Sequence, residues 1–249
     1  MIPINRLLSF ANSFTFRKMW KLFESGISSI VFVASILLPA VVGNSQSPNI
    51  PPTGRSVFFD SNGRQVSNNE FVDVRMSNFH MPDQTRITTL DDGTVEFRLQ
   101  KVPQEGMQIP DISVTTIDGK TINSSELKGK VVVLNFWFIG CPVCLNHKPY
   151  LNELRAKFAG NDDVIFLAMT DDATSAVKKF VEREKFDYLH AANAGTEMKK
   201  FGFTGFPKNI VISRTGEVIY WRSTVRAWDK FESVVRAAVA ADQNKKIEE

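Results

Sequence analysis

The chain has 249 residues, of which 43% are hydrophobic and 23% are charged, a balance typical of a globular protein with a sizeable core. This composition argues against a disordered chain, a collagen-like fibre and a protein with many membrane spans. The net charge is +3, but residues 46–249 hold equal numbers of basic and acidic side chains. Because a nucleic-acid-binding domain usually carries a basic excess, the sequence predicts no nucleic-acid partner.

The N-terminus has the pattern of a targeting segment. Basic residues precede an apolar run, Ile27–Val42, and no charged residue lies between Glu24 and Arg55. The run is short for a bilayer span but suits the apolar core of a signal peptide. We therefore expect residues 1–45 to be a signal peptide or a membrane anchor, which implies an extracytoplasmic location and membrane contact through this segment only. The long stretch before the apolar core makes Met19 an alternative start.

The next two segments are predicted to be a linker and a small β-rich extension. Residues 46–54 are polar and proline-rich, which is typical of a linker. Residues 55–106 contain short apolar runs separated by turn sequences: Val57–Asp60 before Ser61-Asn62-Gly63, and Ile87–Leu90 and Thr94–Gln100 on either side of Asp91-Asp92-Gly93. About fifty residues are too few for a secure core of their own, so we expect this extension to pack on the following domain.

Strands and helices are predicted to alternate over residues 107–242, ahead of a charged tail at 243–249. The predicted strands are Ser113–Ile117, Thr121-Ile122, Val131–Phe138, Val164–Thr170, Tyr188–Ala191, Asn209–Ser213 and Val218–Arg222. The predicted helices are Pro142–Phe158, Thr174–Glu184, Thr196–Phe201 and Ala227–Ala241. The nearly continuous apolar run VVVLNFWF is typical of a strand buried on both faces. The pattern predicts an α/β fold with a mixed central sheet flanked by helices.

The two cysteines of the chain, Cys141 and Cys144, form one CPVC motif. Because proline is favoured at the first helical position, Pro142 places Cys141 at a helix N-terminus, where backbone N–H groups and the helix dipole stabilise a thiolate. Cys144 lies three residues further along, close enough to form a disulfide. The spacing therefore predicts a dithiol exchange pair in which Cys141 attacks and Cys144 resolves, with Pro142 and Val143 adjusting the redox balance.

A CxxC motif can also be one half of a zinc site. The chain has no second cysteine pair, and its three histidines are scattered along the sequence. The motif therefore favours redox chemistry, with no metal and no cofactor.

The stretch VVVLNFWFIGCPVC resembles the TlpA-like and ResA-like thiol–disulfide reductases. Three further motifs share this resemblance: Ile117-Asp118-Gly119-Lys120, Leu127-Lys128-Gly129-Lys130 and GFPKNIVISRTGEVI. The likeness covers about Met107–Ala241. It implies a thioredoxin-like fold and an exported oxidoreductase that reduces disulfide-bearing protein substrates and receives electrons from an upstream donor. It also implies that Pro207 is a cis-proline, that Phe206, Pro207 and Trp137 bind substrate, and that Pro149 kinks the active-site helix.

Four positions depart from the family pattern. Asn135 stands where cytosolic thioredoxins carry a buried aspartate, and Lys208 stands where a threonine commonly follows the cis-proline. Gly140 replaces a tryptophan, which is expected to open the surface around Cys141. His147 is either a protonated ring that lowers the pKa of the attacking thiol or a solvated helix residue.

Several other functions remain open at this point. A disulfide oxidase or isomerase would use the same fold and the same motif. A thiol peroxidase needs a threonine at the position of Phe138, and a Sco-type copper-delivery protein needs a wider cysteine spacing and a distal histidine such as His190.

Overall fold

The computed structural model describes residues 54–241. The predicted targeting segment, all but the last residue of the predicted linker, and the charged tail lie outside these residues. These described residues belong to one compact unit. Within 54–241, no helix combines the length and the apolarity that crossing a membrane requires.

A five-stranded mixed sheet with the order β11-β10-β7-β8-β9 forms the centre of the larger domain. The central strand β7 (Val131–Phe136) pairs in parallel with β8 (Val164–Met169), which pairs in parallel with β9 (Leu189–Ala191). On its other side β7 pairs antiparallel with β10 (Lys208–Ile212), which continues into the hairpin with β11 (Val218–Arg222). Every residue of β7 is buried, as its apolar run predicts.

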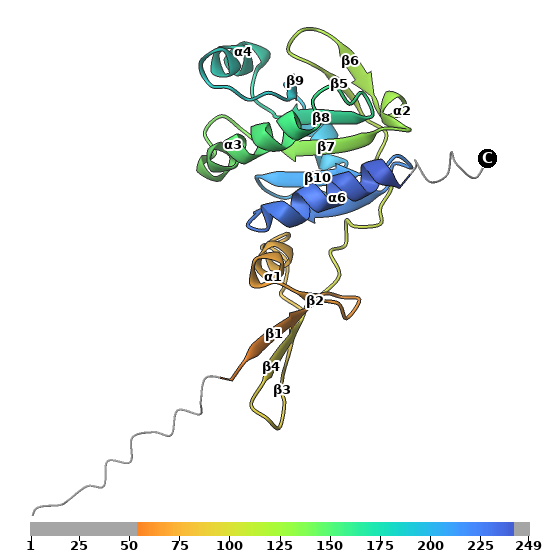
Figure 1. Cartoon of the computed structure of the whole chain (residues 1–249). Helices are drawn as coiled ribbons and strands as arrows, with labels where there is room; N and C mark the ends of the chain where they lie inside the picture. The colour runs from red at the N-terminus through yellow and green to blue at the C-terminus, as the bar shows by residue number, and fades with distance from the viewer. Residues whose placement is uncertain (1–53, 242–249) are drawn as a thin grey trace, which may run out of the picture. The chain divides into compact units, whose positions relative to one another are not determined.

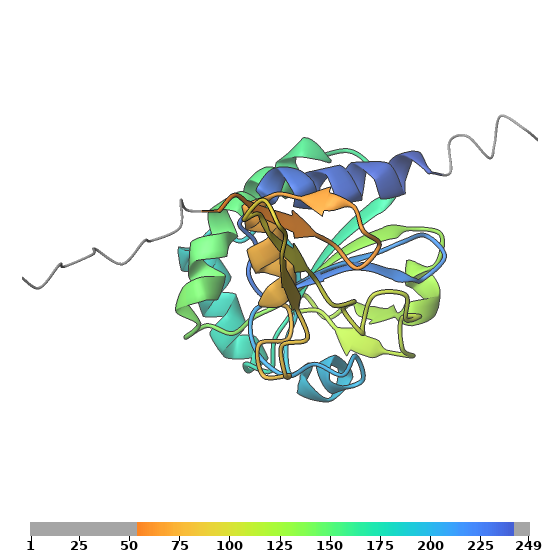
Figure 2. The ribbon, with the colours of Figure 1, turned by 90° about the horizontal axis from the view of Figure 1, so that it is seen from below.

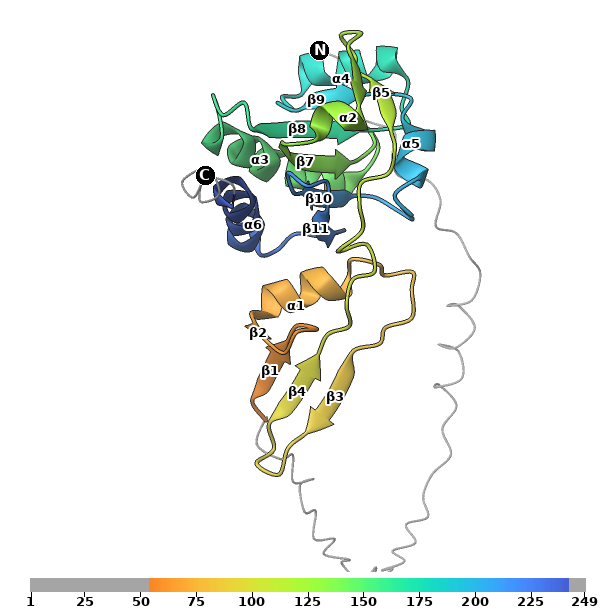
Figure 3. The same ribbon diagram turned by 90° about the vertical axis from the view of Figure 1, so that its right-hand side faces the viewer.

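Helices cover both faces of this sheet. The buried side chains of α3 (Pro142–Lys157) and α6 (Trp228–Ala240) share one hydrophobic cluster, to which α4 (Thr174–Arg183) also contributes. The opposite face is covered by α2 (Ser124–Leu127), α5 (Gly195–Lys199) and the hairpin of β5 (Ser113–Thr115) and β6 (Thr121–Asn123). Helices α6 and α5 accordingly lie on opposite sides of the strands (Figure 2, Figure 3). This is the α/β arrangement of a thioredoxin-like fold.

The strands and helices predicted for this domain are all present, with ends that differ by no more than two residues, and only the short helix α2 is not among them. One difference matters for the site. The strand predicted to run to Phe138 ends at Phe136, because the chain turns away from the sheet there. The backbone N–H of Ile139 donates to the Asp172 carboxylate at 2.8 Å, which holds the loop that leads to the CPVC motif.

The extension contains a four-stranded sheet with the order β2-β1-β4-β3 (Figure 1). The predicted hairpin is present as β3 (Arg86–Thr89) and β4 (Val95–Arg98). Strand β1 (Ser56–Phe59) pairs in parallel with β4 and antiparallel with the short β2 (Gln65–Val66). The extension is β-rich, as predicted.

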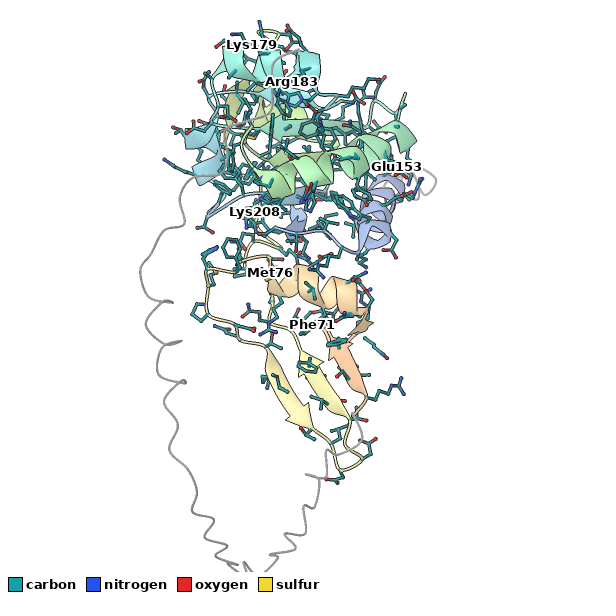
Figure 4. The ribbon with its side chains drawn as sticks, turned by 90° about the vertical axis from the view of Figure 1, so that its left-hand side faces the viewer. Phe71, Met76, Glu153, Lys179, Arg183 and Lys208 are labelled. Atoms are coloured by element: carbon teal, nitrogen blue, oxygen red, sulfur yellow. A yellow bond between two sulfur atoms is a disulfide. The ribbon has the colours of Figure 1, made fainter. Side chains whose placement is uncertain are left out.

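Helix α1 (Asn68–Arg75) was not predicted. It begins with a capping box, in which the Glu70 N–H donates to the Ser67 hydroxyl at 3.2 Å and the Ser67 N–H donates to the Glu70 carboxylate at 3.1 Å. This Ser-x-x-Glu pattern is visible in the sequence and could have located the helix. Phe71 extends from α1 to form a small core with Val66 and Leu99 (Figure 4).

The extension is fastened to the larger domain by buried hydrogen bonds. The carboxylate of Asp73, on α1, accepts the backbone N–H groups of Arg226 at 2.8 Å and Ala227 at 2.9 Å. Helix α6 starts at this point without a side-chain cap of its own, so Asp73 satisfies donors next to its N-terminus. A second group of bonds joins Ser77 to Ser223 and Lys208. The extension therefore packs on the following domain, as its small size suggested.

Candidate redox site

Cys141 and Cys144 form a disulfide at the N-terminus of α3, with an S–S distance of 2.03 Å and a Cα–Cα distance of 5.2 Å. Cys141 is the N-cap residue and Pro142 is the first residue of the helix, as predicted. The backbone N–H of Cys144 donates to the Cys141 sulfur at 3.1 Å. A negative charge on this sulfur would be stabilised by that N–H group and by the helix dipole.

The surroundings of Cys141 differ from the expectation drawn from Gly140. Cys141 is only 4% exposed, so the glycine does not open the surface around the sulfur. A Cβ atom at position 140 would lie 3.3 Å from Cε2 of Phe138. The ring of Phe138 therefore covers the space that a larger side chain at position 140 would take.

The peptide bond between Phe206 and Pro207 is cis, as the resemblance implies. The Phe206 ring packs against the cluster that contains both cysteines and meets the ring of Phe138 edge-to-face, with a centroid distance of 5.1 Å. Phe138 is 37% exposed, and the motif residue Val143 and its neighbour Leu145 are exposed as well. An apolar rim thus borders the buried disulfide, made by Phe138, Val143, Leu145 and Phe206.

Trp137 does not belong to this rim. Its indole is buried and packs against the rings of Phe180, Phe186 and His190. The expectation that Trp137 contacts substrate is therefore corrected, because the strand ends one residue earlier and the next side chain turns into the core. Trp137 instead anchors the start of the loop that leads to the CPVC motif. Its indole packs in the core, and its backbone N–H donates to the Met169 carbonyl.

His147 fits neither of the two interpretations drawn from the sequence. The ring is buried, meets the Trp228 ring edge-to-face at 5.2 Å, and places Nδ1 3.5 Å from the Asn209 amide. Burial lowers the pKa of His147 to about 4, so the ring is neutral at pH 7. His147 is therefore neither a solvated residue nor a source of positive charge for the thiol.

The two remaining departures from the family pattern lie side by side. The buried Asn135 amide donates to the Lys208 carbonyl at 3.2 Å and to the Asn209 side chain at 3.0 Å, which ties β7 to β10. The Lys208 side chain runs toward the extension, where its ammonium donates to the Ser77 carbonyl at 2.8 Å and to the Ser223 hydroxyl. The involvement of Ser77 was not foreseen, because nothing in the sequence links it to position 208.

Other sequence candidates are placed as follows. Pro149 lies inside α3, as the resemblance implies. His190 is buried, with Nε2 2.9 Å from the Phe186 carbonyl oxygen. Across residues 54–241, no group of three or more His, Cys, Asp or Glu side chains is arranged to hold a metal ion.

Comparison with known proteins places this site in a family. A family model described as Redoxin matches residues 104–238, which is more than half of the chain. Thiol-disulfide oxidoreductase ResA of Bacillus thuringiensis subsp. konkukian is 33% identical over 124 residues, covering 49% of this chain and 72% of that protein. ResA of Oceanobacillus iheyensis is 25% identical over 140 residues, covering 56% and 67% respectively.

A solved structure shows the same fold. The solution structure of a Bacteroides thetaiotaomicron protein described as a disulfide isomerase matches with a TM-score of 0.52 and 22% identity, covering 57% of this chain and 94% of that one. The matched segment in each comparison spans about half of this chain, and the Redoxin match begins after most of the extension. Together with the disulfide at the start of α3, these findings show that the chain is a thiol–disulfide oxidoreductase and belongs to the Redoxin family.

Proposed function

We propose that this chain is an exported reductase of protein disulfides. The observation that carries the proposal is the position of the Cys141 sulfur, which accepts the Cys144 N–H at the start of α3 and is bordered by the apolar rim of Phe138, Val143, Leu145 and Phe206. A thiolate held in this way can attack a disulfide, and an apolar rim suits a polypeptide that carries one.

In the proposed reaction two electrons pass from the protein to its substrate. The Cys141 thiolate attacks one substrate sulfur, so a Cys141–substrate disulfide forms while the substrate disulfide breaks, and the second substrate sulfur leaves as a thiolate that takes up a proton. Cys144 then loses its proton and attacks the Cys141 sulfur. This step closes the Cys141–Cys144 disulfide and releases the first substrate sulfur as a thiol. An upstream dithiol donor reduces the pair again.

The reducing direction is supported by the states of two basic side chains, His147 on α3 and Lys208 next to Pro207. Cations near the attacking sulfur stabilise its thiolate and make a dithiol pair more oxidising. His147 is neutral at pH 7, and the Lys208 ammonium is bonded to Ser77 and Ser223. The helix N-terminus therefore stabilises the Cys141 thiolate without an added positive charge from His147 or Lys208. A disulfide oxidase or isomerase would need stronger thiolate stabilisation.

The cysteine roles are tested by trapping. Cys144→Ser should accumulate a mixed disulfide between Cys141 and a protein substrate such as insulin, because no resolving thiol remains. Cys141→Ser should form none. Equal trapping by the two variants would contradict the assignment of the attacking thiol.

The direction of electron transfer and the cellular location of the protein need separate measurements. Equilibration of the wild-type protein with glutathione should give a reduction potential more negative than about −200 mV, whereas a value near −120 mV, typical of a strong oxidant, would favour an oxidase. Export is tested by fusing residues 1–45 to a reporter enzyme that is active only outside the cytoplasm. A reporter that stays inactive would contradict an extracytoplasmic location.

A further inference from the structure

We propose that the exposed side chains of Met76, Phe79 and Met81 in the extension form a second wall of the substrate-binding surface, with Phe79 as its principal contact. This inference deepens the proposed function and rests on it, because it assigns residues that recognise the polypeptide around the attacked disulfide. The ligand is an extended polypeptide segment with apolar side chains next to its cysteine.

Phe79 lies against the loop that carries the cis-proline. A Cβ atom built at Gly205 would be 3.5 Å from Cζ of Phe79, which is ordinary van der Waals contact. Gly205 has a φ of +134°, a conformation that other residues rarely adopt, and it directly precedes the cis Phe206-Pro207 bond. The ring of Phe79 is therefore next to the peptide segment that borders the disulfide.

The loop that carries Phe79 is held on both sides. Before it, the Ser77 carbonyl accepts hydrogen bonds from the Lys208 ammonium at 2.8 Å and from the Ser223 hydroxyl at 2.9 Å. After it, the His80 ring bonds to the hydroxyl of Thr204. Lys208 follows Pro207 directly and is fully buried, and in Figure 4 it lies near Met76 of the extension.

Phe79 nevertheless keeps much of its surface in solvent. The side chain is 55% exposed, although its backbone neighbours are anchored. It also lines a groove of about 350 Å³ together with the exposed Met76 and Met81, and the polar part of the lining comes from Gln100 and the Arg75–Asp83 ion pair. Aromatic and methionine side chains are enriched where proteins bind partners, and methionine adapts to different apolar sequences. A fixed but exposed ring in such a groove is suited to contact a ligand.

The surface is continuous with the apolar rim of the redox site. Phe79 lies next to Gly205, the following residue is Phe206, and the Phe206 ring meets Phe138 beside the CPVC motif. A polypeptide whose disulfide lies at Cys141 can therefore extend from the rim onto Phe79. Most of the extension lies outside the Redoxin match at 104–238, so this wall is an addition to the part of the chain that the family model covers.

The test compares two activated disulfides that have the same leaving group. One is a ten-residue peptide with Leu, Val and Phe around a cysteine that carries thionitrobenzoate, and the other is cysteamine carrying the same group. The thiolate of Cys141 in Cys144→Ser attacks the peptide or cysteamine sulfur, the new disulfide forms, and thionitrobenzoate leaves with the electron pair. Its absorbance gives the rate constant, and the ratio of the two rate constants measures peptide recognition independently of the redox potential.

We expect the peptide-to-cysteamine ratio to be well above one in the Cys144→Ser background and to fall about fivefold when Phe79→Ala is added, as expected for loss of one aromatic contact. Phe79→Leu should retain much of the ratio because it keeps an apolar side chain. The matched control is Ile87→Ala, which removes a side chain that is 61% exposed on β3 of the same extension and should leave the ratio unchanged.

The outcomes separate this inference from the function on which it rests. A high ratio that Phe79→Ala leaves unchanged would overturn the role of Phe79 while the proposed function stands. A ratio near one before any change at position 79 would overturn the preference for polypeptide disulfides, and the second wall with it. Equal losses in Phe79→Ala and Ile87→Ala would also overturn the assignment, since they would indicate a general effect on the extension.

Discussion

The ammonium nitrogen of Lys208 lies 2.8 Å from the carbonyl oxygen of Ser77, so the strand that follows the cis-proline is joined directly to the end of α1. The same ammonium bonds the Ser223 hydroxyl, and no carboxylate within 54–241 forms an ion pair with it. Burial lowers the pKa of Lys208 to about 8. Lysine side chains are usually solvated, but Lys208 forms a buried link between the extension and the redox domain.

The link predicts a stability change at alkaline pH. The Lys208 side chain releases its proton near pH 8 in the folded protein and near 10.5 in the unfolded chain. Between these values the unfolded chain binds more protons, so rising pH favours the folded state. Relative to Lys208→Met, the wild-type free energy of unfolding should therefore increase from pH 8 to pH 10. Urea unfolding of both proteins measures this difference, and a difference independent of pH would contradict the buried ammonium.

A second prediction concerns the cap that α1 supplies near the start of α6. Asp73→Ala should lower the free energy of unfolding by roughly 2–4 kcal/mol, because the N–H groups of Arg226 and Ala227 would lose their acceptor. Asp73→Asn keeps one acceptor oxygen and should cost less. The control Asp91→Ala, in the exposed β3–β4 turn, should change stability by less than about 0.5 kcal/mol. Similar losses in Asp73→Ala and Asp91→Ala would argue against a specific cap.

The central sheet and the cysteine pair could be predicted because their signals are local. The apolar run at Val131–Phe136 is short and rich in valine, which favours a strand buried on both faces, and the proline after Cys141 indicates where the helix begins. Helix α1 also has a local signal, the Ser67 and Glu70 capping box, which the strand-rich pattern around it obscured.

The placements of His147 and Lys208 could not be predicted, since each depends on side chains far away in the sequence. Spacing puts His147 one turn beyond Cys144 but does not show that Trp228 of α6 covers it. Lysine is rarely fully buried, and the acceptor of Lys208 lies 131 residues earlier in the chain. Both corrections concern tertiary packing around the site, while the predicted redox motif itself is present.

A third prediction concerns the reactivity of the reduced cysteines. Cys141 should have a pKa below the free-thiol value of about 8.5, because the Cys144 N–H and the helix dipole act on its sulfur. Alkylation rates measured against pH should show Cys141 reacting before Cys144. His147→Ala should leave the titration of Cys141 unchanged between pH 6 and 8, since the histidine is neutral there. A raised Cys141 pKa in that variant would show that His147 is protonated after all.

A fourth prediction concerns the stability of the protein in acid. Burial lowers the pKa of His147 from 6.5 to about 4, so between these values the unfolded chain binds a proton that the folded protein does not. The folded state should therefore lose stability as pH falls from 6.5 to 4, by at most about 3 kcal/mol from this side chain. His147→Phe keeps a flat ring against Trp228 and cannot take up a proton.

The difference between the two proteins isolates this contribution, because all other titrating groups are shared. The wild-type free energy of unfolding, minus that of His147→Phe, should be constant above pH 7 and should decrease toward pH 4. Protonation of His147 should also disturb the packing next to the redox site. His147 lies beside Asn209, which accepts a hydrogen bond from Asn135 and follows Lys208 in β10. A flat difference across this pH range would mean that the ring takes up its proton as readily in the folded protein as in the unfolded chain.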